Sequence, residues 1–420
     1  MSSVRRAHLR AGGVQVLTLT LRPEADVAGV RADVESTLDD VRRRGDDALV
    51  DMTRRFDCAD FTHDRLRVSG ARLQRSLDGL GSDLREAIVA AAAQVRAVSE
   101  AQLPDDRHIT LPFGQRVTVR SVPVHAAGCY VPGGRAAYPS TLIMTAVPAL
   151  AAGVERIAVV TPPGSDGRPN ATVMATAALL GIEEVYAVGG AASIGALAHG
   201  TATIDPVAVI VGPGNPWVQE AKRQVVGEVG IDGIAGPSEV MIIADATADP
   251  EALALDLLAQ AEHGPDSPAV LASDDPAVIT AIEDALSRLP DPIGPVTLVE
   301  CATLWLAVEL AEAFAPEHLE IATRDADGVA EHITRSGAVF VGPNCATAFG
   351  DYVAGSNHVL PTGGAARHSS ALGPATFLRR MSVVEMTDEA VTELTPHLSV
   401  LAAAEGFPFH ARSAEARRKA

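Results

Sequence analysis

The chain has 420 residues, and 34 Lys and Arg against 53 Asp and Glu give it a formal charge of −19. Hydrophobic residues make up 47% and charged residues 21%, the proportions of a soluble globular protein, and the length predicts roughly two to four domains. The acidic balance excludes a general nucleic-acid binder, which needs a basic surface. The longest nearly uncharged apolar stretch, residues 142–154, is too short to cross a bilayer, which excludes a transmembrane protein.

Cysteine usage and the N-terminus indicate the compartment. The chain has four widely spaced cysteines, Cys58, Cys129, Cys301 and Cys345. None belongs to a CxxC pair, which argues against a disulfide framework and against a cysteine-rich structural zinc site. Arginines near the N-terminus are not followed by the apolar segment of a secretory signal. We therefore expect a cytoplasmic protein.

Strand-like and helix-like segments alternate along the chain after a long helix predicted at 83–102. Runs rich in β-branched residues predict strands at 116–124, 156–161, 184–188, 207–211, 239–244 and 269–272. Alanine-rich stretches between them predict helices at 140–152, 170–180, 191–199, 216–226, 250–261 and 276–289. Short strands joined by helices are typical of parallel sheets. The predicted fold class is α/β, with two incomplete Rossmann-like open sheets and small appended segments at both ends.

Three glycine-rich loops follow predicted strands, at 128–134, 189–191 and 212–215. In doubly wound sheets the loops at the carboxyl ends of strands form the ligand crevice, and glycine lets the backbone approach a ligand closely. None of the three matches the GxGxxG dinucleotide fingerprint. Tight turns between strand and helix would explain any one of them equally well.

Polar residues further along suggest a metal site and a proton-transfer site. Gln260 and His263 lie three residues apart near a predicted helix end, so both could face one ion. Nitrogen and oxygen ligands without thiolate suit zinc or another borderline divalent ion. Glu317 beside His318 is a plausible acid–base pair. A histidine after a helix is more often a cap or a surface residue, and the spacing alone does not prove that these segments converge.

Seven long motifs occur in order and carry a family resemblance: GCYVPGGRAAYPST, VGPGNPWVQEAKRQV, IAGPSEVMIIAD, LLAQAEHGPDS, APEHLEI, GDYVAGSNHVLPT and LTPHLSVLAAAEGFPFH. Together they resemble histidinol dehydrogenase, and the resemblance runs over nearly the whole chain. It implies oxidation of L-histidinol to L-histidine through L-histidinaldehyde, by two successive hydride transfers to NAD. These are the last steps of histidine biosynthesis.

The resemblance also implies the site residues. One zinc per subunit would be bound by Gln260, His263, Asp351 and His410. Glu317 and His318 would be the catalytic acid–base pair, with the pKa of a neutral His318 near the working pH so that it can take the alcohol proton. Substrate contacts would come from Ser238, Gln260, His263, His318, Asp351, His358, Glu405 and His410.

Cofactor contacts and assembly follow from the same resemblance. NAD contacts would fall on Tyr130 and Asn215, whereas Ala192 occupies a position at which the family has a cofactor-binding glutamine. Glu405 and His410 would reach the site from the other subunit of a homodimer. The implied division is an N-terminal arm at 1–26, a first α/β domain at 27–127 and 239–372, a second α/β domain inserted at 128–238, and a dimerisation segment at 373–420.

Two other classes of function stay open on the sequence. A paralogue could oxidise another small hydroxyl compound, and Ala192 is the residue that favours this alternative. A metal-dependent hydrolase could use zinc, Glu317 and water. A binding protein on an inactive scaffold is disfavoured because the metal and acid–base positions are chemically intact.

Overall fold

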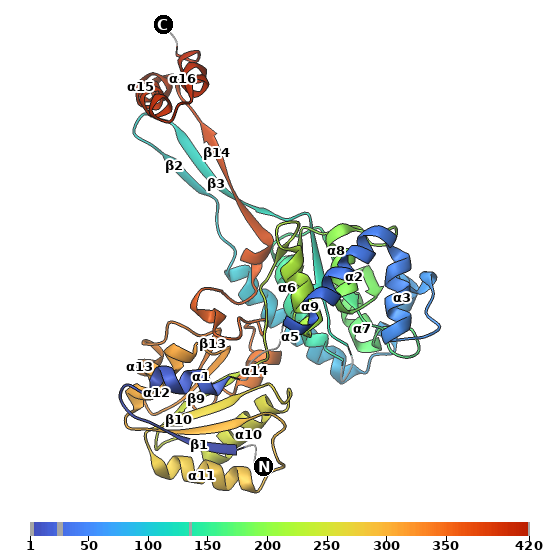
Figure 1. Cartoon of the computed structure of the whole chain (residues 1–420), viewed down its shortest axis with the longest axis vertical. Helices are drawn as coiled ribbons and strands as arrows, with labels where there is room; N and C mark the ends of the chain where they lie inside the picture. Colours follow the sequence, from blue (N-terminus) through green and yellow to red (C-terminus); the bar gives the residue numbers. More distant parts are fainter. Residues whose placement is uncertain (1–3, 23–27, 134–136, 419–420) are drawn as a thin grey trace. The chain divides into compact units, whose positions relative to one another are not determined.

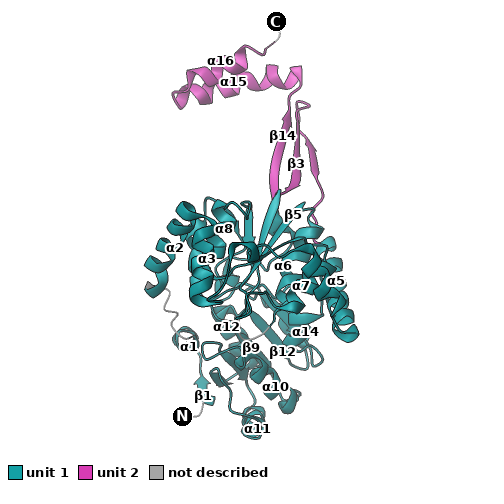
Figure 2. Ribbon diagram, turned by 90° about the vertical axis from the view of Figure 1, so that its right-hand side faces the viewer, with its two compact units in different colours: residues 1–101, 125–377 teal, residues 102–124, 378–420 magenta. Residues whose placement is uncertain are grey.

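The computed structural model describes residues 4–22, 28–133 and 137–418, and it divides into two compact units. The first unit comprises the described residues up to Ala101 together with His125–Phe377, and the second comprises Gln102–Val124 and the described residues from Leu378 onwards (Figure 2). Among the described residues, helices that are both long and apolar enough to cross a membrane are absent.

A six-stranded parallel sheet forms one part of the first unit, with strand order β1-β11-β10-β9-β12-β13. Its strands are β1 (Val4–Leu9), β9 (Val240–Ala244), β10 (Ala269–Ser273), β11 (Val296–Cys301), β12 (His318–Ala322) and β13 (Ala338–Val341). Leaving β1 aside, the order is that of a Rossmann sheet, and it reverses between β9 and β12. The central strands are buried on both faces, as their continuous apolar runs require.

A five-stranded parallel sheet forms the other part, with strand order β6-β5-β4-β7-β8. Its strands are β4 (Ala126–Tyr130), β5 (Arg156–Thr161), β6 (Glu184–Ala187), β7 (Val209–Val211) and β8 (Gly230–Ile231). This is the same Rossmann order, and it reverses between β4 and β7. The fold class predicted from the sequence is therefore confirmed.

Helices cover both faces of each sheet (Figure 1). The six-stranded sheet is covered on one face by α1 (Val14–Leu21), α12 (Leu304–Phe314) and α13 (Ala326–Ala330), and on the other by α10 (Pro250–Ala261) and α11 (Pro276–Ser287). The helix α14 (Thr347–Tyr352) packs against α10 and β12. The five-stranded sheet is covered by α6 (Pro139–Ala151), α7 (Ala171–Leu179), α8 (Gly190–His199) and α9 (Pro216–Val225). Against these helices pack α2 (Arg31–Arg44), α3 (Asp46–Phe56), α4 (Gly70–Asp78) and α5 (Ser82–Ala101).

The second unit is a small antiparallel sheet followed by two helices. Its strands are β2 (Arg107–Thr110), β3 (Arg116–Pro123) and β14 (Leu378–Glu385), with β3 between the other two. The register of β3 with β14 runs from Pro123 opposite Leu378 to Arg116 opposite Glu385. The helices are α15 (Asp388–Ala404) and α16 (Pro408–Glu415), which pack against each other.

The division of the chain differs from the domains expected from the sequence. Residues 4–9 form an edge strand of the six-stranded sheet rather than part of an arm, while residues 1–3 and 23–27 lie outside the described residues. Helices α2 to α5 pack against α6 to α9 of the five-stranded part, whereas the expected division grouped 27–127 with 239–372. Residues 102–124 belong to the C-terminal unit because β3 pairs with β14.

One buried ion pair anchors the end of α1 to the start of β9. Arg22 binds Glu239 with two parallel hydrogen bonds, Nε to Oε2 at 2.7 Å and Nη2 to Oε1 at 2.8 Å, and it also donates to the carbonyl of Phe314. Burial raises the pKa of Glu239 and nearby Glu317 adds to this, while Arg22 opposes both effects. The Glu239 side chain is 2% exposed, so its charge depends on this partner.

We expect Arg22→Met to lower the free energy of unfolding by about 3–5 kcal/mol, because it leaves the Glu239 carboxylate buried and unpaired. The double variant Arg22→Met/Glu239→Gln should recover most of this loss. Urea denaturation midpoints provide the measurement. Arg6→Met is the matched control, since its ion pair with Glu283 is exposed and should contribute less than about 1 kcal/mol. Equal losses for Arg6→Met and Arg22→Met would contradict the argument.

Candidate active site

The candidate acid–base pair lies where two neighbouring strands of the six-stranded sheet begin. In the parallel register of β9 and β12, His318 is opposite Val240. Glu239 and Glu317 precede these strands, so both lie at the same amino edge of the sheet. The backbone N–H of His318 donates to the Glu239 carbonyl at 3.2 Å, which extends the pairing to this edge. The geometry therefore follows from strand order and register.

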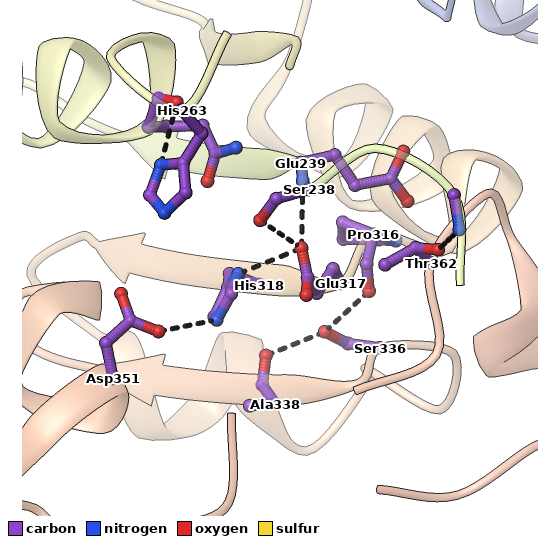
Figure 3. Close-up of polar contacts among 12 residues, drawn as sticks. Ser238, Glu239, His263, Pro316, Glu317, His318, Ser336, Ala338, Asp351 and Thr362 are labelled. Carbon is purple, nitrogen blue, oxygen red and sulfur yellow. Dashed lines mark hydrogen bonds and ion pairs between the residues drawn. The ribbon is translucent and has the colours of Figure 1, made fainter. Parts of the chain in front are cut away.

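The Glu317 carboxylate is held by two donors from the segment that leads into β9 (Figure 3). Its Oε2 accepts a hydrogen bond from Ser238 Oγ at 2.5 Å and another from the Glu239 backbone N–H at 2.9 Å. Glu317 is 6% exposed. These contacts fix the direction of the carboxylate while it stays close to His318.

His318 lies between two carboxylates. Its Nδ1 is 3.5 Å from Glu317 Oε2 and its Nε2 is 3.4 Å from Asp351 Oδ1, which are ion-pair distances. Burial alone would lower the pKa of His318, but the charges of Glu317 and Asp351 outweigh it and raise the pKa to about 10. The two carboxylates thus raise the pKa above the range expected from the sequence, which placed only Glu317 beside the ring.

Asp351 and His358 are joined through the backbone. His358 Nδ1 donates to the Asp351 carbonyl at 2.8 Å, and burial lowers the pKa of His358, so this imidazole stays neutral. Burial would raise the pKa of Asp351, but the hydrogen bond from His318 and the nearby His358 and His263 hold it below its usual value. Asp351 is therefore an ionised carboxylate surrounded by imidazoles.

Gln260 and His263 come from the end of α10, on the side of β12 that carries His318. His263 Nδ1 lies 3.1 Å from the carbonyls of Ala259 and Gln260, so this nitrogen carries the proton and Nε2 keeps a lone pair. Figure 3 shows the ring extending from the helix toward the strands. Gln260 is 5% exposed, and its amide nitrogen has no hydrogen-bond partner among the described residues.

These donors fit a borderline divalent ion chemically. A free imidazole nitrogen and an ionised carboxylate are ligand types that zinc accepts, and the amide of Gln260 could add only its oxygen. Clusters of three or more His, Cys, Asp and Glu side chains placed to hold a metal are absent from the described residues. The set expected from the sequence has two such side chains in the first unit, His263 and Asp351.

Glu405 and His410 belong to the second unit. Glu405 follows the last turn of α15, and His410 lies in α16 with its ring 5.2 Å from that of Phe407. Both residues are exposed. The structure thus places the expected ligands on two separate units.

The expected cofactor residues lie in the five-stranded sheet, near the strands where its order reverses. Tyr130 ends β4, and burial raises the pKa of its hydroxyl to about 12. Asn215 follows β7 and caps α9, because its side-chain oxygen accepts from the Val218 N–H at 3.1 Å. Ala192 is 3% exposed and packs in the core of this part. Gly134 lies outside the described residues.

Sequence reasoning missed two residues of the site. Glu239 supplies a backbone donor to Glu317, and Arg22 neutralises the Glu239 side chain. Ser238, next to Glu239, was identified through the family motif. Nothing in the sequence around Arg22 indicates a partner more than two hundred positions away.

Comparison with known proteins gives a consistent assignment. The family described as histidinol dehydrogenase matches residues 20–418. A histidinol dehydrogenase from Rhizobium meliloti is 45% identical over 401 residues, covering 92% of each chain, and one from Zymomonas mobilis is 42% identical over 98% of each chain. The crystal structure of histidinol dehydrogenase from Elizabethkingia anophelis is similar with a TM-score of 0.94 at 30% identity, covering 99% of this chain and 98% of that one. The chain therefore belongs to the histidinol dehydrogenase family of oxidoreductases.

Proposed function

We propose that the protein oxidises L-histidinol to L-histidine through L-histidinaldehyde, with one zinc ion per subunit and two molecules of NAD reduced in succession. The observation that carries this proposal is the continuous set of contacts from Ser238 through Glu317 and His318 to Asp351. It combines a buried acid–base pair with one carboxylate of the expected metal set. Family membership supports the substrate.

Gln260, His263 and Asp351, with His410, are the residues that would hold the metal. A bound zinc would act as a Lewis acid that fixes the imidazole and amine of the substrate near the hydride acceptor. Ser238, Gln260, His263, His318, Asp351 and His358 are proposed to contact the substrate from this chain. Because Nδ1 of a neutral His358 donates to the Asp351 carbonyl, its Nε2 suits accepting a hydrogen bond from the hydroxyl or amine of the substrate.

Glu317 and His318 are proposed to act as one coupled acid–base unit. With a zinc ion bound to Asp351, one of the two carboxylates that raise the pKa of His318 would be offset, so the ring could then accept the alcohol proton, while Glu317 is proposed to accept a proton from water. The first oxidation requires removal of the alcohol proton, and the second requires activation of a water that adds to the aldehyde. His318 is proposed to meet the first need and Glu317 the second, and the two groups are 3.5 Å apart.

The cofactor is proposed to bind where the order of the five-stranded sheet reverses, at the carboxyl ends of β4 and β7. Tyr130 and Asn215 lie at this place, which is the usual ligand position in doubly wound sheets. Ala192 lacks the amide that the family uses there, so this contact is absent. This residue keeps open the alternative of a paralogue that oxidises another hydroxyl compound.

The active site is proposed to be shared between the two subunits of a homodimer. Glu405 and His410 lie on exposed positions of the second unit, whose helices carry exposed apolar residues such as Val400 and Phe409. An exposed apolar surface of this kind is typical of an interface. Glu405 and His410 would then complete the site of the other subunit. The protein is expected to act in the cytoplasm.

The central test is formation of NADH from histidinol. We expect two NADH per histidinol consumed, loss of activity after treatment with a chelator, and recovery on addition of zinc, because the metal holds the substrate. The absorbance of NADH and the release of histidine provide the measurements. Hydrolysis of an ester or amide without NADH formation would instead favour the metal-dependent hydrolase, and activity with other hydroxyl compounds alone would favour the paralogue.

The two half-reactions should respond differently to substitution of the acid–base pair. We expect Glu317→Gln to slow oxidation of histidinaldehyde more than that of histidinol, because the aldehyde step needs an activated water. His318→Asn should slow both, since each step releases a proton. General acid–base groups contribute about 10²- to 10⁴-fold, which stopped-flow measurement of NADH can resolve.

Glu251→Gln serves as the control for these rates, because Glu251 pairs with Arg288 on the surface of the same part. Its half-reaction rates should match those of the unmodified protein. If Glu317→Gln slows both steps equally, the assignment of water activation to Glu317 is wrong.

A shared site predicts complementation between two inactive chains. In a mixed dimer of His263→Ala and His410→Ala chains, one site receives both defects and the other receives neither. Random exchange makes about half of the dimers mixed, so about a quarter of the original activity should return. Activity before and after subunit exchange is the measurement. Background activity after proven exchange would mean that His410 acts within its own chain.

A further inference from the structure

A second buried ion pair has no role in the proposed chemistry. Lys222 on α9 and Asp232 after β8 form an ion pair, with their side chains 1% and 6% exposed. Burial of two charges is costly unless their other hydrogen bonds are also satisfied. In this pair, each of them also binds the backbone of a nearby loop.

Both members of the pair hold the same glycine. Lys222 Nζ donates to the Gly212 carbonyl at 3.0 Å, and Asp232 Oδ2 accepts from the Gly212 N–H at 2.7 Å. Gly212 has a φ of +119°, and a Cβ there would lie 2.2 Å from the Tyr130 carbonyl oxygen. The loop at residues 212–215 is therefore clamped against the end of β4, where the cofactor is proposed to bind. A glycine has no side chain for anchoring, so the ion pair supplies the anchor.

The same helix also holds the connecting segment, residues 232–238, which joins the two sheets. Gln219, one turn before Lys222, accepts from the Ala235 N–H at 2.8 Å, and its amide nitrogen lies 3.4 Å from the Gly214 carbonyl. The connecting segment starts at Asp232 and ends at Ser238, which donates to Glu317. One buried face of α9 thus fixes both the proposed cofactor loop and the segment that reaches the acid–base pair.

We propose that Lys222 and Asp232 are positioning residues for the dinucleotide, holding the 212–215 loop in its binding conformation and the connecting segment in register with Glu317. This inference rests on the proposed function, since it takes the 212–215 loop as a cofactor contact. Without the pair, the loop loses the two hydrogen bonds that orient the carbonyl and the N–H of Gly212. Only a fraction of the molecules then has the loop in its binding conformation, so the apparent affinity for the cofactor falls.

The chain offers a natural reporter for this loop. It has two tryptophans, Trp217 and Trp305. Trp217 lies in the first turn of α9, two residues after Asn215, and is 46% exposed, whereas Trp305 lies in α12 of the six-stranded sheet. In a Trp305→Phe background, emission of Trp217 reports binding of NADH through energy transfer. Its quenching by acrylamide reports the exposure of the loop without cofactor.

In that background we expect Lys222→Met to weaken NADH binding by about tenfold or more, the effect of losing one hydrogen bond to a charged group. Acrylamide quenching of Trp217 should increase. Arg223→Met is the matched control, because the neighbouring Arg223 pairs with Glu220 and does not contact the loop. Its NADH affinity should stay within about twofold of the parent, even if its stability falls.

If Lys222→Met does not fold, the double variant Lys222→Met/Asp232→Asn leaves no unpaired charge and keeps an amide oxygen for the Gly212 N–H. The same loss of NADH affinity is expected, because the bond to the Gly212 carbonyl is gone. A folded variant of either kind that binds NADH like the parent overturns the positioning role. If the Trp305→Phe parent itself does not bind NADH, the proposed cofactor site is wrong and the inference fails with it. Measuring the parent first therefore separates failure of the proposed function from failure of the inference.

Discussion

Two carboxylates, Glu239 and Glu317, are buried side by side where β9 and β12 begin, and the site depends on how their charges are balanced. Arg22 binds Glu239 in a bidentate pair, so this carboxylate is neutralised from the side of α1. Glu317 is left to Ser238, the Glu239 N–H and His318. Because each carboxylate has its own cation, one can be structural while the other stays close to a proton donor. Strand order alone brings these residues together, and the cations make the arrangement stable.

The proposed cofactor site and the acid–base pair lie at opposite kinds of edge, the first at the carboxyl ends of strands and the second at the amino ends. The proposed cofactor loops follow β4 and β7 at the carboxyl edge of the five-stranded sheet, whereas Glu317 and His318 stand at the amino edge of the six-stranded sheet. The usual rule for doubly wound sheets applies to the first and not to the second. Residues 232–238 connect these edges directly, since they leave β8 at its carboxyl end and enter β9 at its amino end. A short connection of this kind limits how far the two edges can separate.

Sequence reasoning predicts elements well where one strong pattern acts. The strand at 156–161 and the helix at 250–261 match β5 and α10 to the residue, because a β-branched run and an Asp-Pro helix start leave little choice. No strand was predicted at 318–322, because His318 and Glu320 interrupt its apolar run. The strand is nevertheless buried throughout. Which sheet the helices before residue 101 cover is decided by packing against α6 to α9, and chain order does not reveal it. The ion pair of Arg22 with Glu239 could not be predicted either, because it too depends on how distant segments pack.

Three histidines of the site differ because of the group that each nitrogen faces. His263 and His358 both place Nδ1 on backbone carbonyls, which accept only, so each ring is a fixed tautomer with a lone pair on Nε2. His318 faces carboxylates on both sides, and its pKa rises to about 10. His263 is therefore both a helix cap and a potential ligand, so two interpretations that compete on the sequence are compatible in the structure. The partner of one nitrogen decides what the other nitrogen of the same ring can do.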